Sequence, residues 1–412
     1  MQHRDVVIVG AGHAGAQLAA LLRHQGYPGS IAMLGDEPEL PYERPPLSKD
    51  YLSGAKAFEQ LLLRPGEYWV QHAIELRLGQ RVVAVDADAR CVTTAAGERL
   101  GYGQLVWAAG GAPRRLGCAG SALAGVHAVR SRADVDRLVG ELGGCRRVVV
   151  IGGGYIGLEA AAVLRQLGKA VTVLEAQDRV LARVAGEALS RFYEAEHRAQ
   201  GVELRLGVAV ERLDGRDGRV DTVVLAGGDR VAADLVIVGI GIVPEVAPLV
   251  AAGLEPANGV LVDEYCRTRL PAVFAIGDCA AHLNRHAAGT APIRLESVQN
   301  ANDQAKVVAG CIGGQPQAYD ALPWFWSDQY DLKLQTVGLS GGHDQVVLRG
   351  DPAARSFSVV YLKQGRVLAL DCVNLMRDFV QGKALVKGRV AVDPAALADA
   401  ATPLKALAAV AA

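Results

Sequence analysis

Runs of consecutive apolar residues that end in glycine dominate the hydrophobic pattern of this chain. Residues 6–9 form the first run, and their β-branched side chains predict a strand buried on both faces. Residues 16–22 then have the apolar spacing of a helix. The same change recurs after residues 148–151, where a helical pattern ends near Leu167 with Gly168 as its cap. Alternation of strand and helix predicts a parallel sheet of the α/β class.

Shorter apolar segments predict the remaining elements. A helix is expected over 298–312, with Ser297 as its cap and Gly313-Gly314 at its end. From about residue 321 the pattern predicts antiparallel strands joined by glycine turns, then a helix at 374–383 and an alanine-rich tail. Strands are expected at 30–34, 81–86, 90–94, 105–111, 170–174, 235–241, 324–326, 332–337, 345–348, 356–362 and 367–373.

The loop after the first strand has the spacing G-x-G-x-x-G. Gly10 allows a tight turn, Gly12 lets the backbone approach a pyrophosphate, and Gly15 lets the helix pack on the strand. The helix N-terminus favours an anion because its first N–H groups lack helical partners. Asp36 ends the second strand, where it can bind a ribose hydroxyl.

A second loop of this kind occupies Gly152, Gly154 and Gly157, and its second strand leads to Glu175. A carboxylate there accepts from both ribose hydroxyls of NAD and repels the 2′-phosphate of NADP, so we expect NADH. Two such units in one chain predict two nucleotides that meet, most simply a flavin dinucleotide and a nicotinamide dinucleotide.

Two further motifs lie outside the glycine loops. Pro45-Pro46 predicts an extended segment that presents Arg44 and Lys49 rigidly. A short strand before Gly277-Asp278 places a carboxylate where it can bind a ribityl hydroxyl; taken alone, this carboxylate could belong to an ordinary turn.

Composition excludes several classes of function. With 43 basic and 44 acidic side chains, the formal net charge of −1 gives no overall case for nucleic-acid binding. The seven cysteines are scattered and none has C-x-x-C spacing, so no redox dithiol, metal or iron–sulfur site is expected. The basic, then apolar N-terminus resembles a signal peptide, but a glycine loop inside the apolar run argues against its removal. No long apolar run predicts a membrane span, so we expect a cytoplasmic protein.

Together these motifs resemble those of the NADH-dependent, FAD-containing ferredoxin reductases of bacterial cytochrome P450 and ring-hydroxylating dioxygenase systems. The resemblance spans essentially the whole chain and rests on GAGHAG, YERPPLSK, the glycine-ended strand near residue 110, GGGYIGLE with Glu175, FAIGDC, RLESVQNA and PWFWSDQ. It implies a glutathione-reductase-like α/β fold with two Rossmann-type domains and a C-terminal α+β domain. The FAD domain would comprise 1–113 and 244–320, the NADH domain 114–243 and the β-rich domain 321–412.

The resemblance also implies roles for individual residues. FAD would be bound by Gly10, Gly12, His13, Ala14, Gly15, Asp36, Arg44, Lys49, Val82, Ala109, Gly110, Arg130, Gly277, Asp278, Ser297, Val298 and Trp326. NADH would be bound by Gly152, Gly154, Ile156, Gly157, Glu159, Glu175, Arg183 and Gly241. Lys49, Glu159, Glu296 and Trp326 would act in catalysis. One departure from the family is W-A-A-G at 107–110, where A-T-G is usual and supplies a further hydroxyl.

The implied reaction passes a hydride from NADH to the flavin and electrons singly to a [2Fe–2S] ferredoxin, which supplies a P450 or Rieske oxygenase. An acidic ferredoxin would dock transiently, steered by basic side chains; Arg64, Arg294, Lys333 and Lys387 are the candidates. The N-terminus of helix 298–312 would stabilise negative charge on the reduced flavin.

Other functions remain open at this point. A rubredoxin reductase would differ only at its docking surface. A flavin-dependent NADH oxidase or peroxidase needs a cysteine after the second strand, and residues 41–56 contain none. A non-enzymatic NADH-responsive protein is a further alternative. Neither His13 nor His197 is expected to act as an acid or base.

Overall fold

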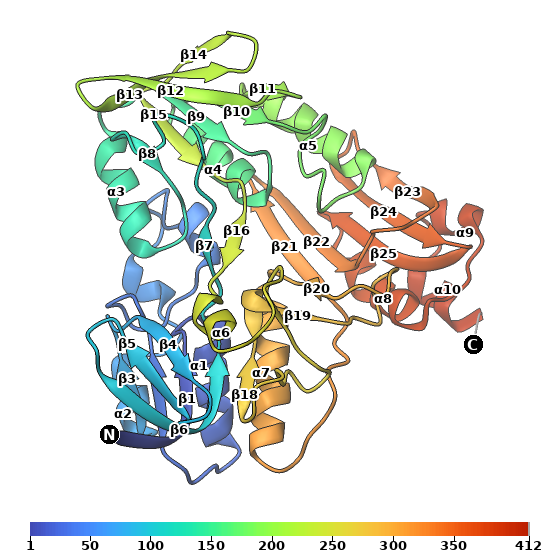
Figure 1. Ribbon diagram of the computed structural model, residues 1–412. Helices are drawn as coiled ribbons and strands as arrows, with labels where there is room; N and C mark the ends of the chain where they lie inside the picture. The colour runs from blue at the N-terminus through green and yellow to red at the C-terminus, as the bar shows by residue number, and fades with distance from the viewer. Residues whose placement is uncertain (411–412) are drawn as a thin grey trace. The chain divides into compact units, whose positions relative to one another are not determined.

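The computed structural model describes residues 1–410 and divides into two compact units (Figure 1). The first unit comprises Met1–Glu43, Phe58–Ala112 and Val243–Pro323, and the second comprises Arg44–Ala57, Pro113–Ile242 and the chain from Trp324 onward. Residues 44–57, expected to belong with the FAD domain, thus group with the second unit. The chain crosses between the units five times, after Glu43, Ala57, Ala112, Ile242 and Pro323; the third and fourth crossings lie in β7 (Gly111–Pro113) and β16 (Ile242–Pro244). The division into three domains stays a prediction.

The first unit is built on a largely parallel sheet with the strand order β3-β2-β1-β6-β5-β4, in which β18 also pairs with β6. Its elements are β1 (Gln2–Val9), α1 (His13–His24), β2 (Ile31–Leu34), η2 (Phe58–Leu61), α2 (Gly66–Gln71), β3 (Ile74–Arg77), β4 (Val82–Asp86), β5 (Cys91–Thr94), β6 (Arg99–Trp107), α6 (Ala247–Ala251), β17 (Val260–Leu261), β18 (Val273–Ala275), η3 (Gly277–Cys279), β19 (Ala280–His282), β20 (Ile293–Arg294) and α7 (Val298–Ile312).

Residues 6–9 of strand β1 are buried on both faces, as the sequence predicts. Val6 and Ile8 pack with α1 and α7 in one hydrophobic cluster, whereas Val7 and Val9 belong to a second cluster. Trp107 fills part of that second cluster and its Nε1 donates to the Glu245 carbonyl oxygen at 2.7 Å. The tryptophan of the W-A-A-G departure therefore has a structural role in the core.

The second unit combines a parallel sheet, β11-β10-β9-β15-β8, with two antiparallel sheets, β12-β13-β14 and β21-β22-β25-β24-β23. Its elements are η1 (Pro45–Ser48), β8 (Val126–His127), α3 (Arg132–Leu142), β9 (Arg147–Ile151), α4 (Tyr155–Gln166), β10 (Ala170–Glu175), α5 (Glu187–Ala199), β11 (Glu203–Leu206), β12 (Val210–Arg216), β13 (Arg219–Leu225), β14 (Arg230–Ala232), β15 (Leu235–Val238), β21 (Trp324–Gln329), β22 (Leu332–Gly338), β23 (Gln345–Asp351), β24 (Ser356–Lys363), β25 (Arg366–Val373), α8 (Met376–Gly388), α9 (Pro394–Ala398) and α10 (Leu404–Val410).

The predicted antiparallel C-terminal sheet is confirmed, and the helix expected at 374–383 runs from Met376 to Gly388. The prediction of an extended segment at Pro45-Pro46 is wrong, because these residues begin the 3₁₀ helix η1 and Arg44 before them is also helical. Proline suits the first helical positions, since its fixed φ matches the helix and its missing N–H would have no helical partner there.

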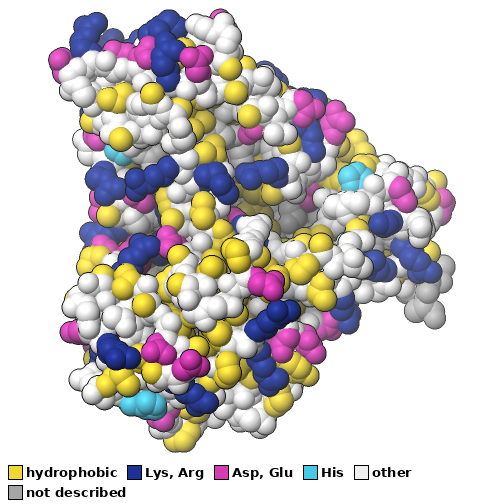
Figure 2. All heavy atoms as spheres, viewed as in Figure 1, with side chains coloured by type: hydrophobic (Ala, Val, Ile, Leu, Met, Phe, Trp, Pro, Cys, Tyr) yellow, Lys and Arg dark blue, Asp and Glu magenta, His cyan; other side chains and the backbone are white. Residues whose placement is uncertain are grey.

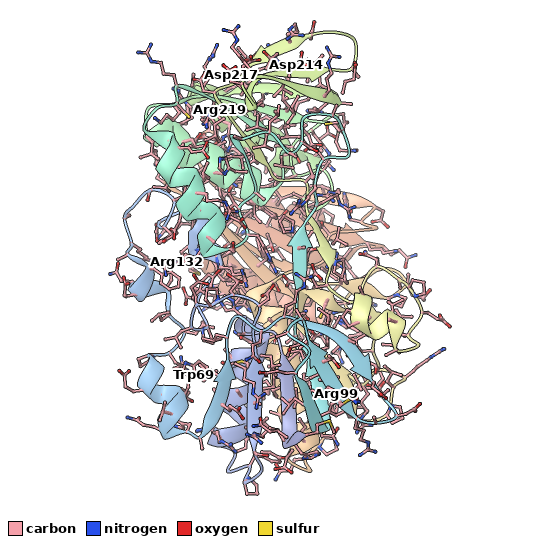
Figure 3. All side chains as sticks on the ribbon, turned by 60° about the vertical axis from the view of Figure 1, so that its left-hand side comes forward. Trp69, Arg99, Arg132, Asp214, Asp217 and Arg219 are labelled. Carbon is pink, nitrogen blue, oxygen red and sulfur yellow. The ribbon has the colours of Figure 1, made fainter. Side chains whose placement is uncertain are left out.

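Several elements lie outside the continuous apolar runs of the sequence. Helix α3 begins at Arg132 after a capping box formed by Ser131 and Asp134 (Figure 3). In the hairpin β12–β13, Asp217 occupies a left-handed turn position with φ +51°, and Arg219 pairs with Glu141 at 2.6 Å (Figure 3). In these segments exposed charged residues separate the apolar ones, so no continuous apolar run marks them.

The surface is electrostatically mixed. On the face shown in Figure 2, Lys and Arg side chains stand among Asp and Glu side chains, in keeping with the net charge of −1. Within residues 1–410, no helix is long and apolar enough to cross a membrane. The seven cysteines all lie in the described residues and form no disulfide there.

Candidate cofactor and electron-transfer site

The first glycine loop lies at the C-terminal end of β1, between the ends of β2 and β6. A methyl group on Gly10, where φ is +114°, would lie 2.2 Å from the Ala108 carbonyl oxygen; one on Gly15 would lie 2.0 Å from that of Gly10. A methyl group on Gly12, by contrast, would meet no heavy atom of the described residues within 4 Å. The outer glycines therefore permit close protein packing, whereas the middle glycine faces space at the N-terminus of α1, where a pyrophosphate fits.

The second loop repeats this arrangement after β9, which lies between β10 and β15. Methyl groups on Gly152 and Gly157 would lie 2.4 Å and 2.1 Å from backbone oxygens, whereas one on Gly154 would have no neighbour within 4 Å among residues 1–410. Gly154 is also the N-cap of α4 and has no side chain with which to cap it. The residues of both loops thus fit a dinucleotide by the same criterion.

Each of the two strands next to a glycine loop leads to a carboxylate. Glu175 is the last residue of β10; its Oε2 accepts from the Gly153 N–H at 2.6 Å and its Oε1 from the Gln177 N–H at 2.8 Å. Asp36 follows β2, is exposed, and its Oδ2 lies 3.9 Å from Arg81 Nη1. Glu175 is therefore fixed against its loop by the backbone, whereas Asp36 keeps its carboxylate in solvent.

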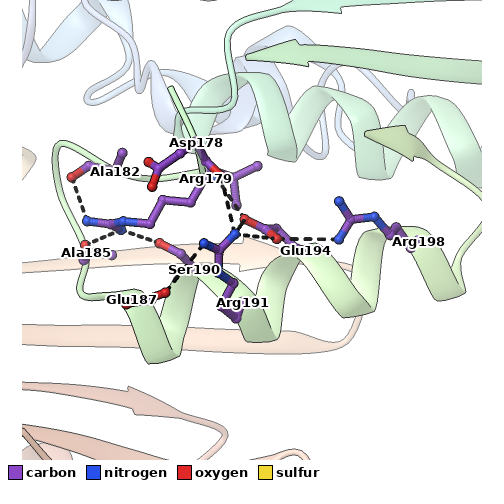
Figure 4. A network of polar contacts seen from close by, with 10 residues as sticks. Asp178, Arg179, Ala182, Ala185, Glu187, Ser190, Arg191, Glu194 and Arg198 are labelled. Atoms are coloured by element: carbon purple, nitrogen blue, oxygen red, sulfur yellow. Dashed lines mark hydrogen bonds and ion pairs between the residues drawn. The ribbon is translucent and has the colours of Figure 1, made fainter. Parts of the chain in front are cut away.

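The loop from 176 to 186 carries Arg183 and is held by hydrogen bonds from Arg179 (Figure 4). Arg179 donates to the Ala185 carbonyl oxygen at 2.8 Å and to Ser190 Oγ at 2.6 Å. The exposed Arg183 lies next to Gly241: a methyl group on Gly241, where φ is +95°, would be 3.6 Å from Arg183 Nη2. The structure thus brings together two residues expected at the NADH site. Ile156, near the start of α4, is 44% exposed.

Asp278 lies in η3 of the first unit, and its loop is held by Gln304, which was not predicted, and by Arg294, for which a docking role was expected. Gln304 Oε1, in α7, accepts from the Gly277 N–H at 2.7 Å. Arg294 Nη1 donates to the Asp278 carbonyl oxygen at 2.6 Å. The signal for Gln304 was a polar residue on the inward face of a helix. Because the Arg294 side chain is only 8% exposed, the prediction that it steers a partner protein is wrong.

The start of α7 carries three of the expected residues. Ser297 caps the helix as predicted, since its Oγ accepts from the Asn300 N–H at 3.1 Å. Val298 is the first helical residue. Glu296 is exposed, and its Oε1 lies 2.8 Å from Arg294 Nη2. The catalytic role expected for Glu296 stays a prediction.

The other residues expected to bind FAD are placed as follows. His13 and the buried Ala14 begin α1, Val82 is buried at the start of β4, and Ala109 and Gly110 follow β6, Gly110 with φ +63°. In the second unit, Arg44 Nη1 donates to the Arg130 carbonyl oxygen at 2.7 Å, which brings these two residues together.

A buried polar cluster in the second unit surrounds Glu159 of α4. Its Oε2 accepts from Lys49 Nζ at 2.8 Å and from Ser48 Oγ at 2.6 Å, and its Oε1 accepts from Ser327 Oγ at 2.6 Å. The Glu159 side chain is 4% exposed and that of Lys49 16%. Two expected residues therefore meet as a buried ion pair, and both serines that hold the carboxylate were missed.

Aromatic side chains continue this cluster along β21. The Phe325 ring packs at a tilt of 36° against that of Tyr155, the first residue of α4, with the ring centroids 4.7 Å apart. Trp324 and Trp326 lie on the opposite face of the strand, with their ring centroids 5.6 Å apart. Lys383 Nζ lies 5.5 Å from the ring centroid of Trp324. Burial raises the pKa of Tyr155, so its hydroxyl stays protonated at neutral pH.

Comparisons with known proteins show the family of this chain. Residues 4–305 match the pyridine nucleotide-disulphide oxidoreductase family, and residues 324–408 match the reductase C-terminal family. A ferredoxin–NAD(P)(+) reductase from a Sphingomonas species is 58% identical over 403 residues, which cover 98% of this chain and 97% of that protein. A rubredoxin–NAD(+) reductase from Pseudomonas putida is 39% identical over 370 residues, covering 90% of this chain and 96% of that protein.

Solved structures match over the same length. The ferredoxin reductase of the CYP199A2 system from Rhodopseudomonas palustris has a TM-score of 0.94 and 41% identity, covering 99% of this chain and 100% of that chain. Putidaredoxin reductase in its covalent complex with putidaredoxin has a TM-score of 0.95 and 40% identity, covering 100% of this chain and 99% of that chain. The expected glutathione-reductase-like fold is confirmed, and the chain belongs to the pyridine nucleotide-disulphide oxidoreductase family, among its ferredoxin reductases.

Proposed function

We propose that the protein is an NADH-dependent, FAD-containing ferredoxin reductase that supplies a cytochrome P450 or a ring-hydroxylating oxygenase through a [2Fe–2S] ferredoxin. The observation that carries this is the pair of glycine loops, each with its middle glycine open to space at a helix N-terminus. Two dinucleotide sites in one chain suit transfer between a nicotinamide and a flavin. The names of the relatives point to the same reaction.

FAD binds without a covalent link in the first unit. The loop at Gly12 holds the pyrophosphate, Asp36 a ribose, and Asp278 the ribityl chain. Gln304 and Arg294 hold the backbone on either side of Asp278 in position. When bound, FAD supplies the chemistry: it takes two electrons as a hydride and passes them on singly.

NADH, and not NADPH, is the electron donor. Glu175 has both carboxylate oxygens fixed by backbone N–H groups, so it stays at the end of β10 and repels a 2′-phosphate. Arg183 beside Gly241 extends the same site.

Lys49 gives the reaction centre a positive charge, and Glu159 holds that charge in place. Because the pair is buried, its field is weakly screened and acts on charge that develops nearby. The N-terminus of α7, capped by Ser297, adds a fixed positive dipole end in the first unit.

The partner is an acidic ferredoxin that docks transiently in the cytoplasm. Arg64, Lys333 and Lys387 are exposed and remain candidates for steering it. Raising the salt concentration should therefore slow ferredoxin reduction while ferricyanide reduction stays constant. Ferredoxin reduction that is insensitive to salt would contradict electrostatic steering.

Purified protein, loaded with FAD, tests the whole proposal. We expect NADH-driven cytochrome c reduction to depend on added [2Fe–2S] ferredoxin. Dependence on rubredoxin instead would select the rubredoxin reductase alternative, and NADH consumption with oxygen alone would select an oxidase. Protein that carries no flavin and does not react with NADH would overturn the proposal.

A further inference from the structure

We propose that His197 is a positioning residue for the buried carboxylate of Glu159. It acts through a chain of hydrogen bonds that begins at Tyr330, just after β21, and ends at Glu159, which pairs with Lys49. The inference rests on the proposed function, because it assigns a role in catalysis to the environment of Glu159.

The hydrogen-bonded chain is possible because side chains alternate between the two faces of β21. Ser327 and Gln329 point to one face of the strand, two residues apart, and both are buried. Against that face pack α4, which carries Glu159, and α5, which carries His197 in its last turn. Tyr330 follows directly at the turn into β22. Sequence reasoning gave His197 no role because its partners lie far along the chain.

Four contacts link these residues without a gap. Tyr330 Oη lies 3.1 Å from His197 Nδ1, and His197 Nε2 lies 2.8 Å from Gln329 Oε1. Gln329 Nε2 donates to Ser327 Oγ at 3.3 Å, and Ser327 Oγ donates to Glu159 Oε1 at 2.6 Å. His197, Gln329 and Ser327 are at most 1% exposed, so water does not compete for these bonds.

The contacts have a single consistent direction. Ser327 has one hydroxyl hydrogen, and if it donates this hydrogen to Glu159, its oxygen must accept from Gln329 Nε2. The amide oxygen of Gln329 then faces His197, which must carry its proton on Nε2. His197 Nδ1 is left to accept from the Tyr330 hydroxyl. Every donor therefore points toward Glu159.

A neutral His197 is required for this direction. Burial lowers the pKa of His197 to about 4, although its hydrogen bond with Gln329 opposes the shift. At neutral pH the ring thus has one N–H, and the amide of Gln329 selects which nitrogen carries it. The histidine and the amide lock each other in one orientation.

Without the Nε2–H donor of His197, the orientation of the Gln329 amide would no longer be fixed. The Gln329 amide could then turn over, so that its oxygen faced Ser327 and took the hydroxyl hydrogen from Glu159. Oε1 of Glu159 would lose its donor in a buried site, while Ser48 and Lys49 still hold Oε2. A buried carboxylate oxygen without a donor is costly, so the carboxylate would shift and move the charge of Lys49.

A variant series separates positioning from folding. His197→Phe removes the donor, His197→Gln restores an N–H at the same reach, and His127→Phe is a matched control. His127 is likewise buried in the second unit and its Nε2 lies 3.2 Å from a carboxylate, that of Glu141, which belongs to no predicted site. All three variants are compared with the wild-type holoenzyme.

Anaerobic stopped-flow measurement of flavin reduction by NADH gives the first result. We expect His197→Phe to be about tenfold slower at saturating NADH, with a nearly unchanged dissociation constant for NADH. The flavin midpoint potential should shift as well. His197→Gln should recover most of the rate and potential, and His127→Phe should change neither. A folded His197→Phe protein with wild-type rate and potential would overturn the proposal.

The protonation of His197 gives a second, independent result. In protein labelled with ¹⁵N-histidine, the His197 signals are identified by their absence from His197→Gln. We expect Nε2 to be protonated and Nδ1 to be unprotonated at neutral pH; the opposite tautomer would overturn the proposal. If the expected tautomer is found in protein whose flavin NADH does not reduce, the proposed function fails and the hydrogen-bonded chain stands.

Discussion

Lys49 Nζ lies 2.8 Å from Glu159 Oε2, in an ion pair that joins the segment after η1 to the glycine-loop helix α4. Because Glu159 is buried, removing Lys49 leaves a carboxylate charge held only by hydrogen bonds from serines. We expect Lys49→Met to keep FAD but to slow flavin reduction by about ten- to a hundredfold, measured by stopped flow. Lys56→Met is the control, since Lys56 pairs with Asp50 at 2.8 Å with both side chains over 40% exposed. Equal rates in the two variants would contradict the role of Lys49.

Glu175 should decide which nicotinamide dinucleotide binds. Its carboxylate is held by the Gly153 and Gln177 N–H groups, so Glu175→Ala removes both the ribose acceptor and the charge. We expect the KM for NADH to rise about tenfold, the KM for NADPH to fall, and bound FAD to remain. Steady-state rates with both donors and the flavin absorbance provide the measurement. An unchanged KM for NADH would reject the assignment of the second glycine loop.

Asp278 should be needed to retain flavin. Gln304 and Arg294 hold the backbone at Gly277 and Asp278, and the Asp278 carboxylate is the group proposed to bind the ribityl chain. We expect Asp278→Ala to lose FAD during dialysis, as followed by absorbance near 450 nm. Asp320→Ala, which removes an exposed partner of Arg285, should keep its flavin. Full retention by Asp278→Ala would count against the ribityl contact.

Arg349 should anchor the C-terminal tail. Its Nε lies 2.6 Å from Asp378 Oδ2, both side chains are fully buried, and its guanidinium also donates to the carbonyl oxygens of Leu397, Asp399 and Thr402. Arg349→Met leaves the buried Asp378 with only the exposed Arg377 as a cationic partner, its Nε 3.6 Å from Oδ1, so we expect a loss of up to roughly 3–5 kcal/mol. Thermal unfolding measures this loss of stability, and we expect proteolysis of the C-terminal segment that carries Leu397, Asp399 and Thr402 to become faster. Arg230→Met, which breaks an exposed pair with Asp214, should change stability by less than about 1 kcal/mol.

The parallel sheets could be predicted because their signals are local. Residues 6–9 and 148–151 are apolar runs followed at once by glycines, and each lies in a strand at the place expected. Helices α3 and α5 were not among the predicted elements, because they contain no continuous apolar run; their buried residues nevertheless keep a helical spacing, as Val135, Leu138 and Leu142 do in α3. The prediction for Pro45-Pro46 is wrong because proline fits both an extended segment and the start of a helix. Contacts between residues distant in sequence, such as that of Arg44 with Arg130, cannot be predicted from a local pattern.

The site shows the same division. Gly12, Gly154, Glu175 and Asp278 belong to short motifs whose spacing carries a physical reason, so they could be found from the sequence. Ser327, Gln329 and His197 are ordinary residues until folding brings β21 and α5 together. The sequence signal for these residues was their polarity at otherwise buried positions, and this signal does not predict which residues they contact.

Asp371 should make stability depend on pH. It is buried in β25, its Oδ2 accepts from Tyr361 Oη at 2.6 Å, and burial raises its pKa to about 7. An unfolded aspartate titrates near 4, so between about pH 4 and 7 the folded state holds a proton that the unfolded state has lost. The contribution of Asp371 to stability is therefore full below about pH 4 and is lost as the pH rises to 7. Asp371→Asn keeps an acceptor for Tyr361 and never carries a charge. We expect the melting temperature of this variant, relative to wild type, to rise from pH 5 to 7 and then level off; a difference that does not change with pH would contradict a protonated Asp371.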